Sequence, residues 1–440
     1  MDPRKTFLIV FILNPSLLLH AIPSLPAQAL PSRSGYLPVT AAGDSAIFYT
    51  FYEAQNPPAS PLTDTPLLIW LQGGPGCSSM VGNFFELGPW RLNPNNPNLQ
   101  LEHNPGAWNR IFGLLFLDNP IGTGFSIASS IEAIPRDQDG VARHLYAAIT
   151  KFIGLDPSFR SRQLYITGES YAGKYIPAIG SHILKMNSLL PVAEQVNLAG
   201  VAIGNGFTDP ATQVATHAAN AYFFGLINES QKCRLEQAQS EAVKLAKMGN
   251  WSAATDARNK AMDMLQNMTG FATLYDFTRS VPYETHLVTR FLKSKEIKRR
   301  LKAKEDIEFI ECSRIVGHAL HDDMMKSTKH LVEFMLRHVK VLLYQGHLDL
   351  RIGVVSNEAW IKSMAWEGID DFLAAERKIW KVEDQLAGYV QKWDKLCDVV
   401  LLGAGHLVPA DQPLRSQAMI EDWVIQGGLF RDEIPSLAAL

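Results

Sequence analysis

Residues 162–174 read Arg-Gln-Leu-Tyr-Ile-Thr-Gly-Glu-Ser-Tyr-Ala-Gly-Lys, an apolar run that passes directly into a glycine-flanked serine. The pattern predicts a short strand, a tight turn and then a helix, with Ser170 on the turn. A serine in this position has its hydroxyl held out at the end of a sheet beside helix amides, which is the geometry of an activated nucleophile. The same residues also fit an ordinary turn with a serine N-cap. The choice depends on whether the rest of the chain supplies a base and an acid.

The bulk composition is that of an ordinary globular protein. The chain has 440 residues, of which 47% are hydrophobic and 19% charged, enough for one large domain with an insertion or for two domains. The formal net charge of −3 gives no support for a nucleic-acid partner or a strongly charged one.

The N-terminus predicts a secretory signal. Arg4 and Lys5 precede the apolar run Thr6–Leu19, and small residues follow it, so residues 1–29 are interpreted as a signal peptide cleaved after Ala29. The run is too short to span a bilayer, although a retained signal anchor is an alternative. We therefore expect a protein of the secretory route that has no membrane association once the signal is removed.

Two further features fit an oxidising, secretory compartment. Three glycosylation sequons lie close together in the chain, and they begin at Asn228, Asn250 and Asn267. Four cysteines allow at most two disulfides, and sequence alone does not fix their pairing: Cys77, Cys233, Cys312 and Cys397.

Short β-rich runs alternate with turns and helical stretches over most of the chain. The expected strands are residues 46–52, 67–71, 113–117, 164–167, 198–203, 339–344 and 398–402. Strands that alternate with helices predict an α/β protein with a mainly parallel sheet and helices on both faces. The alternating pattern of the first strand favours an antiparallel edge.

The central part of the chain has a different character. Residues 211–331 are rich in helix-forming and charged residues, which predicts a mainly helical insertion, or cap. The expected domain organisation is therefore a core in two parts, residues 30–210 and residues 332–440, interrupted by this insertion.

A base and an acid are available at later strand ends. The carboxyl ends of parallel strands meet at one edge of the sheet, so loops that follow them should converge. His406 follows the last expected strand in a Gly-Ala-Gly-His turn, and Asp349 follows the strand before it. Asp322 and Asp323 are rival acids, but they lie in a helical stretch and are expected to face solvent. The order Ser170, Asp349, His406 is the nucleophile, acid and base order of α/β-hydrolases.

Donors for an oxyanion are also predicted. The amide that follows the nucleophile belongs to Tyr171, and a second amide should come from the Gly73-Gly74 pair, which follows a buried strand. Ala172 stands where the nucleophile-elbow pattern has its second glycine, and its methyl group is small enough for that packing.

Several long stretches together resemble the serine carboxypeptidases, acidic-pH peptidases of lysosomes, vacuoles and secretions. The resemblance covers nearly the whole mature chain apart from the insertion. The matching stretches are Trp70-Leu-Gln-Gly-Gly-Pro-Gly-Cys-Ser-Ser79, Glu86-Leu-Gly-Pro89, Pro120-Ile-Gly-Thr-Gly-Phe-Ser126, Thr167-Gly-Glu-Ser-Tyr-Ala-Gly-Lys-Tyr175, Ile203-Gly-Asn-Gly206, Thr208-Asp-Pro210, Gly403-Ala-Gly-His-Leu-Val-Pro409 and Gln412-Pro413.

The resemblance implies an α/β-hydrolase fold and a role for each motif. It implies a triad of Ser170, Asp349 and His406, and an oxyanion hole formed by the amides of Gly74 and Tyr171. It further implies that the substrate's terminal carboxylate is held by Gln72, Gly73, Glu86 and Glu169. An acid binds a carboxylate well only when one of the two carries a proton, which favours cleavage at acidic pH.

The chain departs from the family pattern at two positions. Gln72 replaces the asparagine most common before the two glycines, and Asn119 replaces the usual glutamine before Pro120. The longer Gln72 keeps the carboxamide donor but changes its reach. The resemblance also implies a Cys77–Cys312 disulfide and provides no partner for the other two cysteines.

The sequence therefore predicts a serine carboxypeptidase that acts on peptide or protein C-termini, without a metal or cofactor, in a secreted, vacuolar or lysosomal setting. An acyltransferase that uses glucose esters on the same triad is one alternative, although those relatives tend to carry an aspartate where this chain has Glu169. An inactive binding or chaperone-like homologue is another. The preferred side chains are not predicted, because the pocket walls are expected to come largely from residues 211–331. The oligomeric state is left open as well.

Overall fold

The computed structural model describes residues 24–58, 61–93 and 99–431. The expected signal peptide, residues 1–29, therefore lies for the most part outside the described residues. None of the helices within these three ranges is long and apolar enough to cross a membrane.

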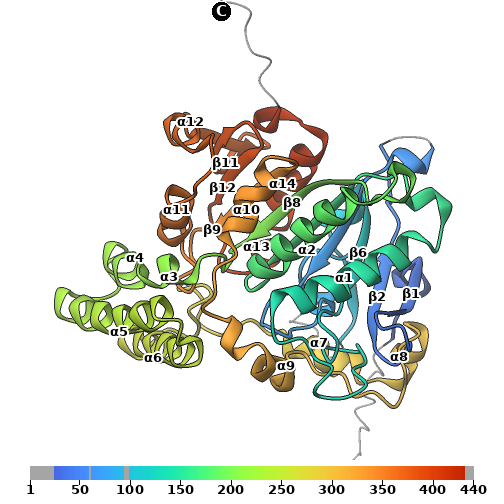
Figure 1. Ribbon diagram of the computed structural model, residues 1–440, viewed down its shortest axis with the longest axis horizontal. Helices are drawn as coiled ribbons and strands as arrows, with labels where there is room; N and C mark the ends of the chain where they lie inside the picture. Colours follow the sequence, from blue (N-terminus) through green and yellow to red (C-terminus); the bar gives the residue numbers. More distant parts are fainter. Residues whose placement is uncertain (1–23, 59–60, 94–98, 432–440) are drawn as a thin grey trace, which may run out of the picture.

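A ten-stranded sheet forms the centre of the molecule (Figure 1), and its strand order is β1-β2-β6-β3-β7-β8-β9-β12-β11-β10. The strands from β6 to β12 in this order pair in parallel, whereas the two strands at each end pair antiparallel. The strands of this sheet are β1 (Arg33–Pro38), β2 (Ala46–Tyr52), β3 (Leu67–Leu71), β6 (Gly113–Leu117), β7 (Leu164–Glu169), β8 (Leu198–Gly204), β9 (Lys340–Gly346), β10 (Lys378–Val382), β11 (Gln385–Trp393) and β12 (Leu396–Leu401). A separate hairpin consists of β4 (Trp90–Leu92) and β5 (Leu101–His103).

Helices cover both faces of the sheet and also form a separate group between β8 and β9. The α-helices are α1 (Gln138–Ile153), α2 (Ala172–Asn187), α3 (Pro210–Val214), α4 (His217–Phe223), α5 (Glu229–Lys247), α6 (Trp251–Thr269), α7 (His286–Leu292), α8 (Lys295–Arg300), α9 (Arg314–Ala319), α10 (Lys329–Leu336), α11 (Val354–Lys362), α12 (Ile369–Ala374), α13 (Val408–Asp411) and α14 (Pro413–Ile425). A π-helical turn, η3 (Gly82–Glu86), and several 3-10 turns complete the description.

Alternation along the strands divides the core into two layers. In β3, Leu67, Ile69 and Leu71 pack with apolar residues of α1, α2 and α10 on one face. Leu68 and Trp70 point the other way and pack with residues of α7 and α14. Strands buried on both faces need continuous apolar runs, which is why these segments were recognisable in the sequence.

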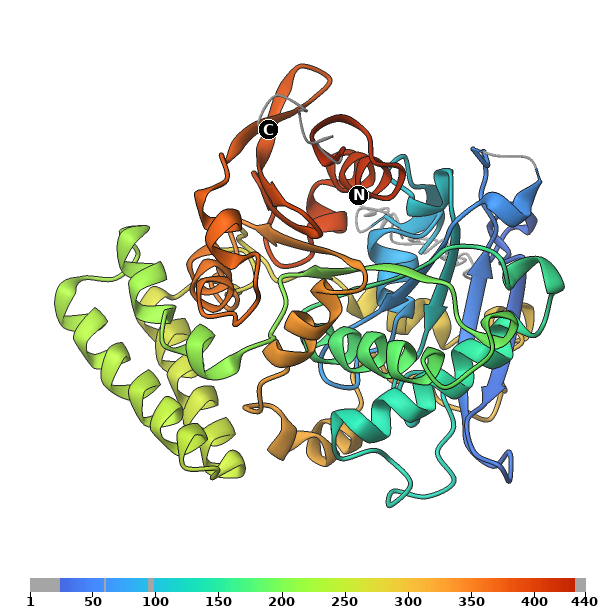
Figure 2. The ribbon, with the colours of Figure 1, turned by 45° about the horizontal axis from the view of Figure 1, so that its top comes forward.

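The structure confirms the α/β-hydrolase fold with its mainly parallel sheet and its helical insertion. In both ribbon views α4, α5 and α6 project beside the sheet (Figures 1 and 2), where they share a small apolar core of their own. Ala46–Tyr52 is a correction: β2 lies between β1 and β6, and all of its residues are buried, so it is not an edge strand. The hairpin of β10 and β11 was not predicted.

Candidate active site

Ser170 occupies the turn between β7 and α2. Its φ of +63° is a left-handed value that is rare outside glycine, as expected for a strained strand-to-helix turn. The turn is held by backbone hydrogen bonds, in which Ser170 N–H donates to Gly204 O at 2.9 Å and Phe207 N–H donates to Ser170 O at 2.9 Å. Gly168 permits the sharp return, because a Cβ there would lie 2.2 Å from the carbonyl oxygen of Leu71.

The predicted base and acid are in contact with each other. His406 Nδ1 lies 2.6 Å from Asp349 Oδ2, and both side chains are buried. Asn205 Nδ2 donates to the same carboxylate oxygen at 2.8 Å, while the other oxygen accepts from the amides of Arg351 and Ile352. This carboxylate is therefore oriented by three donors besides the histidine.

The other nitrogen of the His406 ring faces the pocket. His406 Nε2 is buried and has no hydrogen-bond partner among the described residues, and His406 lines the same pocket as Ser170. The ring of Tyr275 lies over the imidazole at a centroid distance of 4.5 Å, and the backbone N–H of His406 donates to the backbone carbonyl of Tyr275 at 2.7 Å. An imidazole held in this way on one side has its Nε2 free to exchange a proton with a serine.

The structure places the two rival acids, Asp322 and Asp323, in different environments. The expectation that both face solvent was wrong for Asp323. Asp322 is exposed, as expected, with 66% of its side chain accessible. Asp323 is instead buried, with 2% exposure, and its carboxylate accepts hydrogen bonds from Tyr171 and Gln138. It has no contact with His406.

The backbone amides of Gly74 and Tyr171 are the two predicted oxyanion donors. The Gly73-Gly74 loop packs against the serine turn, since a Cβ on Gly73 would lie 2.6 Å from the amide nitrogen of Tyr171. Across the network of hydrogen bonds between described residues, the N–H groups of Gly74 and Tyr171 have no acceptor. Unpaired, fixed amides beside a nucleophile are the donors that an oxyanion hole requires.

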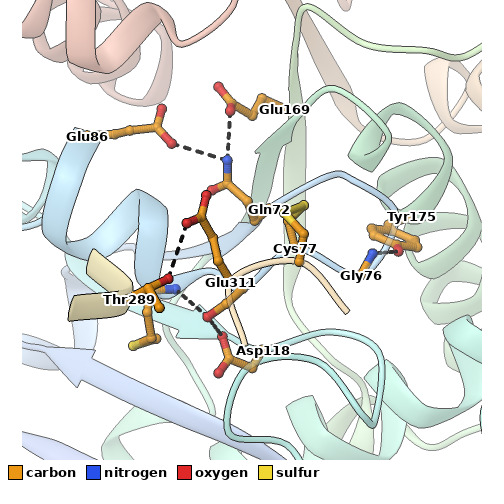
Figure 3. Close-up of a disulfide and its surroundings, with 12 residues drawn as sticks. Gln72, Gly76, Cys77, Glu86, Asp118, Glu169, Tyr175, Thr289 and Glu311 are labelled. Carbon is orange, nitrogen blue, oxygen red and sulfur yellow. Dashed lines mark hydrogen bonds between the residues drawn. A yellow bond between two sulfur atoms is a disulfide. The ribbon is translucent and has the colours of Figure 1, made fainter. Parts of the chain in front are cut away.

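A cluster of carboxyl groups surrounds the amide of Gln72 (Figure 3). Gln72 Nε2 donates to Glu169 Oε1 at 2.7 Å and to Glu86 Oε1 at 3.2 Å, while Gln72 Oε1 accepts from Trp70 Nε1 at 2.8 Å. The two carboxyl groups also lie close enough to share a hydrogen bond when one of them is protonated, and the second oxygen of each accepts from no other group among the described residues. Both glutamates are buried, so this cluster holds spare hydrogen-bonding capacity next to Ser170.

Burial determines how these two acids ionise. It raises the pKa of Glu86 above its ordinary value, because a buried carboxylate loses its hydration. Burial, followed by the negative charge of Glu86, raises the pKa of Glu169 well above its ordinary value. Both groups therefore favour the neutral, hydrogen-bond-donating form over a wider pH range than an exposed glutamate.

One pocket of about 240 Å³ joins most of these groups. Its lining includes Gln72, Gly73, Gly74, Glu169, Ser170 and His406 from the core, and Thr273, Tyr275, Pro282, Tyr283, Thr285, Glu311 and Cys312 from the insertion. Glu86 and Asp349 stand behind this surface and are fully buried. Sequence reasoning did not identify the individual insertion residues or the role of Asn205, although the Gly-Asn-Gly turn that contains Asn205 was visible.

The disulfide joins the early glycine loop to the insertion. Cys77 and Cys312 are bonded, and both line the pocket (Figure 3). Of the remaining cysteines, Cys233 is exposed and Cys397 is buried, and both are free thiols. Asn228, Asn250 and Asn267 are exposed at the start of α5, at the start of α6 and within α6, away from the pocket lining. No group of three or more His, Cys, Asp or Glu side chains in the described ranges could hold a metal ion.

Comparison with known proteins gives a consistent result. The family model described as serine carboxypeptidase matches residues 23–426. The chain is 56% identical to "Serine carboxypeptidase-like 50" of Arabidopsis thaliana, a match that covers 93% of this chain and 90% of the relative. It is 33% identical to "Probable serine carboxypeptidase CPVL" of Homo sapiens, with coverages of 93% and 86%.

A solved structure is similar over almost the full length. The prohormone-processing carboxypeptidase Kex1(delta)p of Saccharomyces cerevisiae superposes with a TM-score of 0.81 at 26% identity, and the match covers 92% of this chain and 94% of that one.

Proposed function

This chain belongs to the serine carboxypeptidase family, and we propose that it releases the C-terminal residue of peptides through an acyl-enzyme formed on Ser170. Membership makes it a serine-type carboxypeptidase, a hydrolase of peptides that have a free C-terminus. The observation that carries the finer proposal is the hydrogen bond from Gln72 to Glu169, because it places spare carboxyl donors one residue from the nucleophile.

In the proposed first step, Ser170 Oγ attacks the carbonyl carbon of the last peptide bond. His406 Nε2 takes the hydroxyl proton, and Asp349 stabilises the resulting imidazolium through Nδ1–H. The carbonyl oxygen becomes negative and accepts hydrogen bonds from the amides of Gly74 and Tyr171. When the C–N bond breaks, His406 gives the proton to the departing amino group, so the terminal residue leaves as a neutral amine and an acyl-Ser170 ester remains.

In the second step water replaces the departed residue. His406 removes a proton from this water, the hydroxide attacks the acyl ester, and the proton then returns to Ser170 Oγ as the shortened peptide leaves. The 2.6 Å contact between His406 and Asp349 supports both steps, because it fixes the tautomer that presents a basic Nε2 to the pocket.

Recognition of the terminal carboxylate is proposed for Gln72, Glu86, Glu169 and the amide of Gly73. A substrate carboxylate beside two buried glutamates is stable only if those glutamates carry protons, since adjacent anions repel. Because its pKa is raised, Glu169 carries its proton without strongly acidic conditions. This supports stronger binding of the substrate carboxylate at acidic than at alkaline pH.

Residues 211–331 are proposed to act as a cap over a core made of residues 30–210 and 332–440. Residues of the cap supply one wall of the pocket, and the Cys77–Cys312 bond fixes that wall to the glycine loop.

A secretory location, with glycans on α5 and α6, is supported by the predicted signal and by the exposure of the three sequon asparagines. The disulfide also fits an oxidising compartment.

The test compares the secreted full-length chain with Ser170→Ala and with Ser188→Ala, which changes an exposed serine near the far end of α2. Release of the terminal residue from an N-blocked dipeptide at mildly acidic pH should be lost only in Ser170→Ala. Undiminished release by this variant would overturn the proposal. Transfer of an acyl group from a sugar ester in place of peptide cleavage, or failure of Ser170 to react with a phosphonate, would instead favour an acyltransferase or an inactive homologue.

A further inference from the structure

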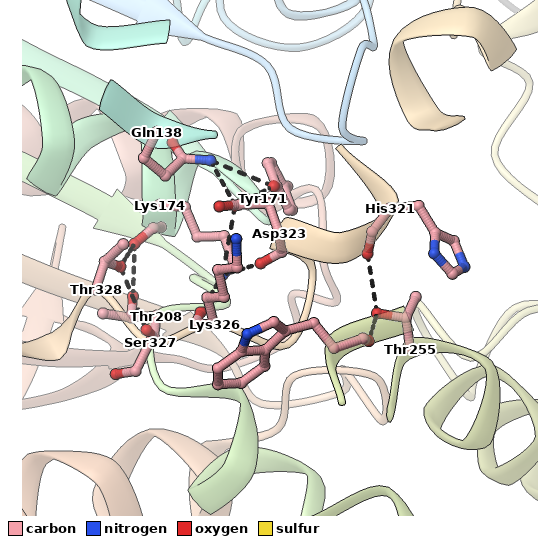
Figure 4. Close-up of polar contacts among 12 residues, drawn as sticks. Gln138, Tyr171, Lys174, Thr208, Thr255, His321, Asp323, Lys326, Ser327 and Thr328 are labelled. Atoms are coloured by element: carbon pink, nitrogen blue, oxygen red, sulfur yellow. Dashed lines mark hydrogen bonds and ion pairs between the residues drawn. The ribbon is translucent and has the colours of Figure 1, made fainter. Parts of the chain in front are cut away.

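A second buried polar cluster lies directly under the nucleophile elbow (Figure 4). Asp323 Oδ2 accepts a hydrogen bond of 2.6 Å from the Tyr171 hydroxyl and one of 2.7 Å from Gln138 Nε2. Gln138 begins α1, Tyr171 precedes α2, and Asp323 belongs to the segment between α9 and α10. One carboxylate therefore joins both core helices to the end of the helical insertion.

The charge of this carboxylate is balanced within the cluster. The Lys174 ammonium lies 3.8 Å from Asp323 Oδ2 and donates to the backbone carbonyls of Asp323 and Lys326. Lys174 is fully buried, and burial lowers its pKa to about 8. Breaking this buried ion pair would destabilise the fold strongly, because removing either partner leaves the other charge buried and uncompensated.

The cluster holds the residue that offers the oxyanion amide. Tyr171 is 2% exposed, and its ring packs edge-on against the ring of Tyr175 at a centroid distance of 5.1 Å. Burial, followed by the charge of Asp323, raises the pKa of the Tyr171 phenol well above its usual range, so the hydroxyl keeps the proton that it donates. The Tyr171 side chain is thus fixed at its far end, and this restricts the backbone N–H that directly follows Ser170.

We propose that Asp323 is a positioning residue that holds the Tyr171 amide in the oxyanion hole through its hydrogen bond with the Tyr171 hydroxyl. This inference rests on the proposed function, and neither the triad nor the carboxylate site includes Asp323. It also gives the insertion a part in the chemical step, because the anchor comes from residues that follow the cap helices. A small displacement of a preorganised donor weakens transition-state stabilisation more than it weakens ground-state binding.

The variants are Asp323→Asn, Tyr171→Phe and their combination. Asp323→Asn keeps the shape but replaces the charged acceptor by a weaker, neutral amide oxygen and removes the charge that balances Lys174, whereas Tyr171→Phe removes the donated hydrogen bond itself. Each should lower kcat for an N-blocked dipeptide by roughly tenfold, less than the loss of a whole oxyanion donor, with KM little changed. Asp322→Asn is the matched control, because it alters the adjacent exposed acid.

A double-mutant cycle separates positioning from general destabilisation. If both changes act through one bond, the combined variant should be clearly less impaired than the product of the two single effects. The inhibition constant of a peptide aldehyde, whose hemiacetal oxygen occupies the oxyanion hole, should rise in proportion to the fall in kcat/KM. The melting temperature of each variant is measured so that all assays are made on folded protein.

The outcomes distinguish the inference from the function on which it rests. Asp323→Asn with a lowered melting temperature but the kcat and aldehyde affinity of Asp322→Asn would overturn the positioning role. Fully multiplicative effects of the two changes would overturn the shared bond. If the unaltered chain releases no terminal residue, the proposed function fails instead, and the rate at which a phosphonate labels Ser170 still reports whether Asp323 positions the elbow.

Discussion

The side-chain amide of Gln72 donates a hydrogen bond of 2.7 Å to the carboxyl group of Glu169. Glu169 immediately precedes Ser170, so this bond connects Gln72 to the turn that carries Ser170. The same nitrogen also donates to Glu86, which brings two acids around one amide in a region where burial disfavours their anions. Under the proposed function, the protonation of these acids links substrate binding, stability and pH.

The first prediction concerns the pH dependence of substrate binding. The raised pKa of Glu169 means that the carboxyl is protonated at acidic pH and becomes an anion only as the pH rises through the raised value. The anion repels a substrate carboxylate. KM for an N-blocked dipeptide should therefore increase from mildly acidic to alkaline pH, and Glu169→Gln should flatten this increase because an amide stays neutral.

The matched substrate is the same dipeptide with an amidated C-terminus, which carries no charge at that end. Its KM should be larger at acidic pH but nearly independent of pH. If the amidated and the free-acid substrates show the same rise in KM, the carboxyl cluster does not bind the terminal carboxylate.

The second prediction concerns stability. An acid whose pKa is higher in the folded chain than in the unfolded chain binds more protons when folded, so its contribution to stability is fully present below the unfolded value. That contribution is lost as the pH rises through the folded value, by about 1.4 kcal/mol for each unit of difference. Burial raises the folded pKa of both Glu86 and Glu169. The free energy of unfolding should therefore fall between about pH 4, near the unfolded pKa of a glutamate, and alkaline pH.

Glu86→Gln combined with Glu169→Gln should make this decline shallower, because neither amide ionises. Glu102→Gln, at an exposed position in β5, serves as the control. Denaturant unfolding at several pH values measures the slope. A double variant with the same slope as the control would show that the buried pair does not govern the pH dependence.

The strands at the centre of the fold were predictable because a strand buried on both faces requires an uninterrupted apolar run. Leu67–Leu71 and Gly113–Leu117 form β3 and β6 within the bounds that the sequence suggested. The strand β10, Lys378–Val382, was missed because it is a short edge strand with neither a continuous apolar run nor a regular alternation, and only Trp380 in it is buried.

The elbow and the early glycine loop were predictable for a related reason, since each follows such a strand directly. The environment of Asp323 was not predictable. Its hydroxyl partner, Tyr171, lies 152 positions earlier in the chain, and no local pattern distinguishes Asp323 from the exposed Asp322. The same applies to Glu311 and Tyr283, which reach the pocket only because the insertion folds back over the core.

The third prediction concerns the unusual residue Gln72. Its side chain joins Trp70, Glu86 and Glu169, and Asn at this position would be shorter by one C–C bond of about 1.5 Å. Gln72→Asn restores the residue more common in the family but cannot reach all three partners. Leaving a buried group unsatisfied costs about 1–3 kcal/mol, so KM for a free-acid dipeptide should rise by roughly tenfold.

Gln385→Asn, at an exposed position in β11, is the control for the loss of a methylene. The comparison uses KM at acidic pH together with the free energy of unfolding. A Gln72→Asn variant that binds the dipeptide as well as the unaltered chain does would mean that the extra length of Gln72 has no role in the carboxyl cluster.

The fourth prediction concerns the side chain of the released residue. Glu311 is half-buried in the pocket wall, where one of its carboxyl oxygens accepts a hydrogen bond from Thr289 Oγ1 at 3.3 Å. No lysine or arginine is among the described residues that line this pocket. A carboxylate in a partly desolvated wall attracts cationic side chains and repels acidic ones, so kcat/KM should be higher for dipeptides ending in Arg or Lys than for those ending in Glu.

An interaction of about 1 kcal/mol, typical of a partly exposed charge pair, corresponds to about a fivefold preference that Glu311→Gln should remove. Glu308→Gln is the matched control, because it removes a carboxylate that is 74% exposed three positions earlier. The preference should also weaken as the salt concentration rises, since screening shortens the range of the attraction. If both variants shift the ratio equally, the net charge of the protein sets the preference rather than Glu311, whereas a loss confined to Glu311→Gln and sensitive to salt locates the selectivity in the wall that the insertion contributes.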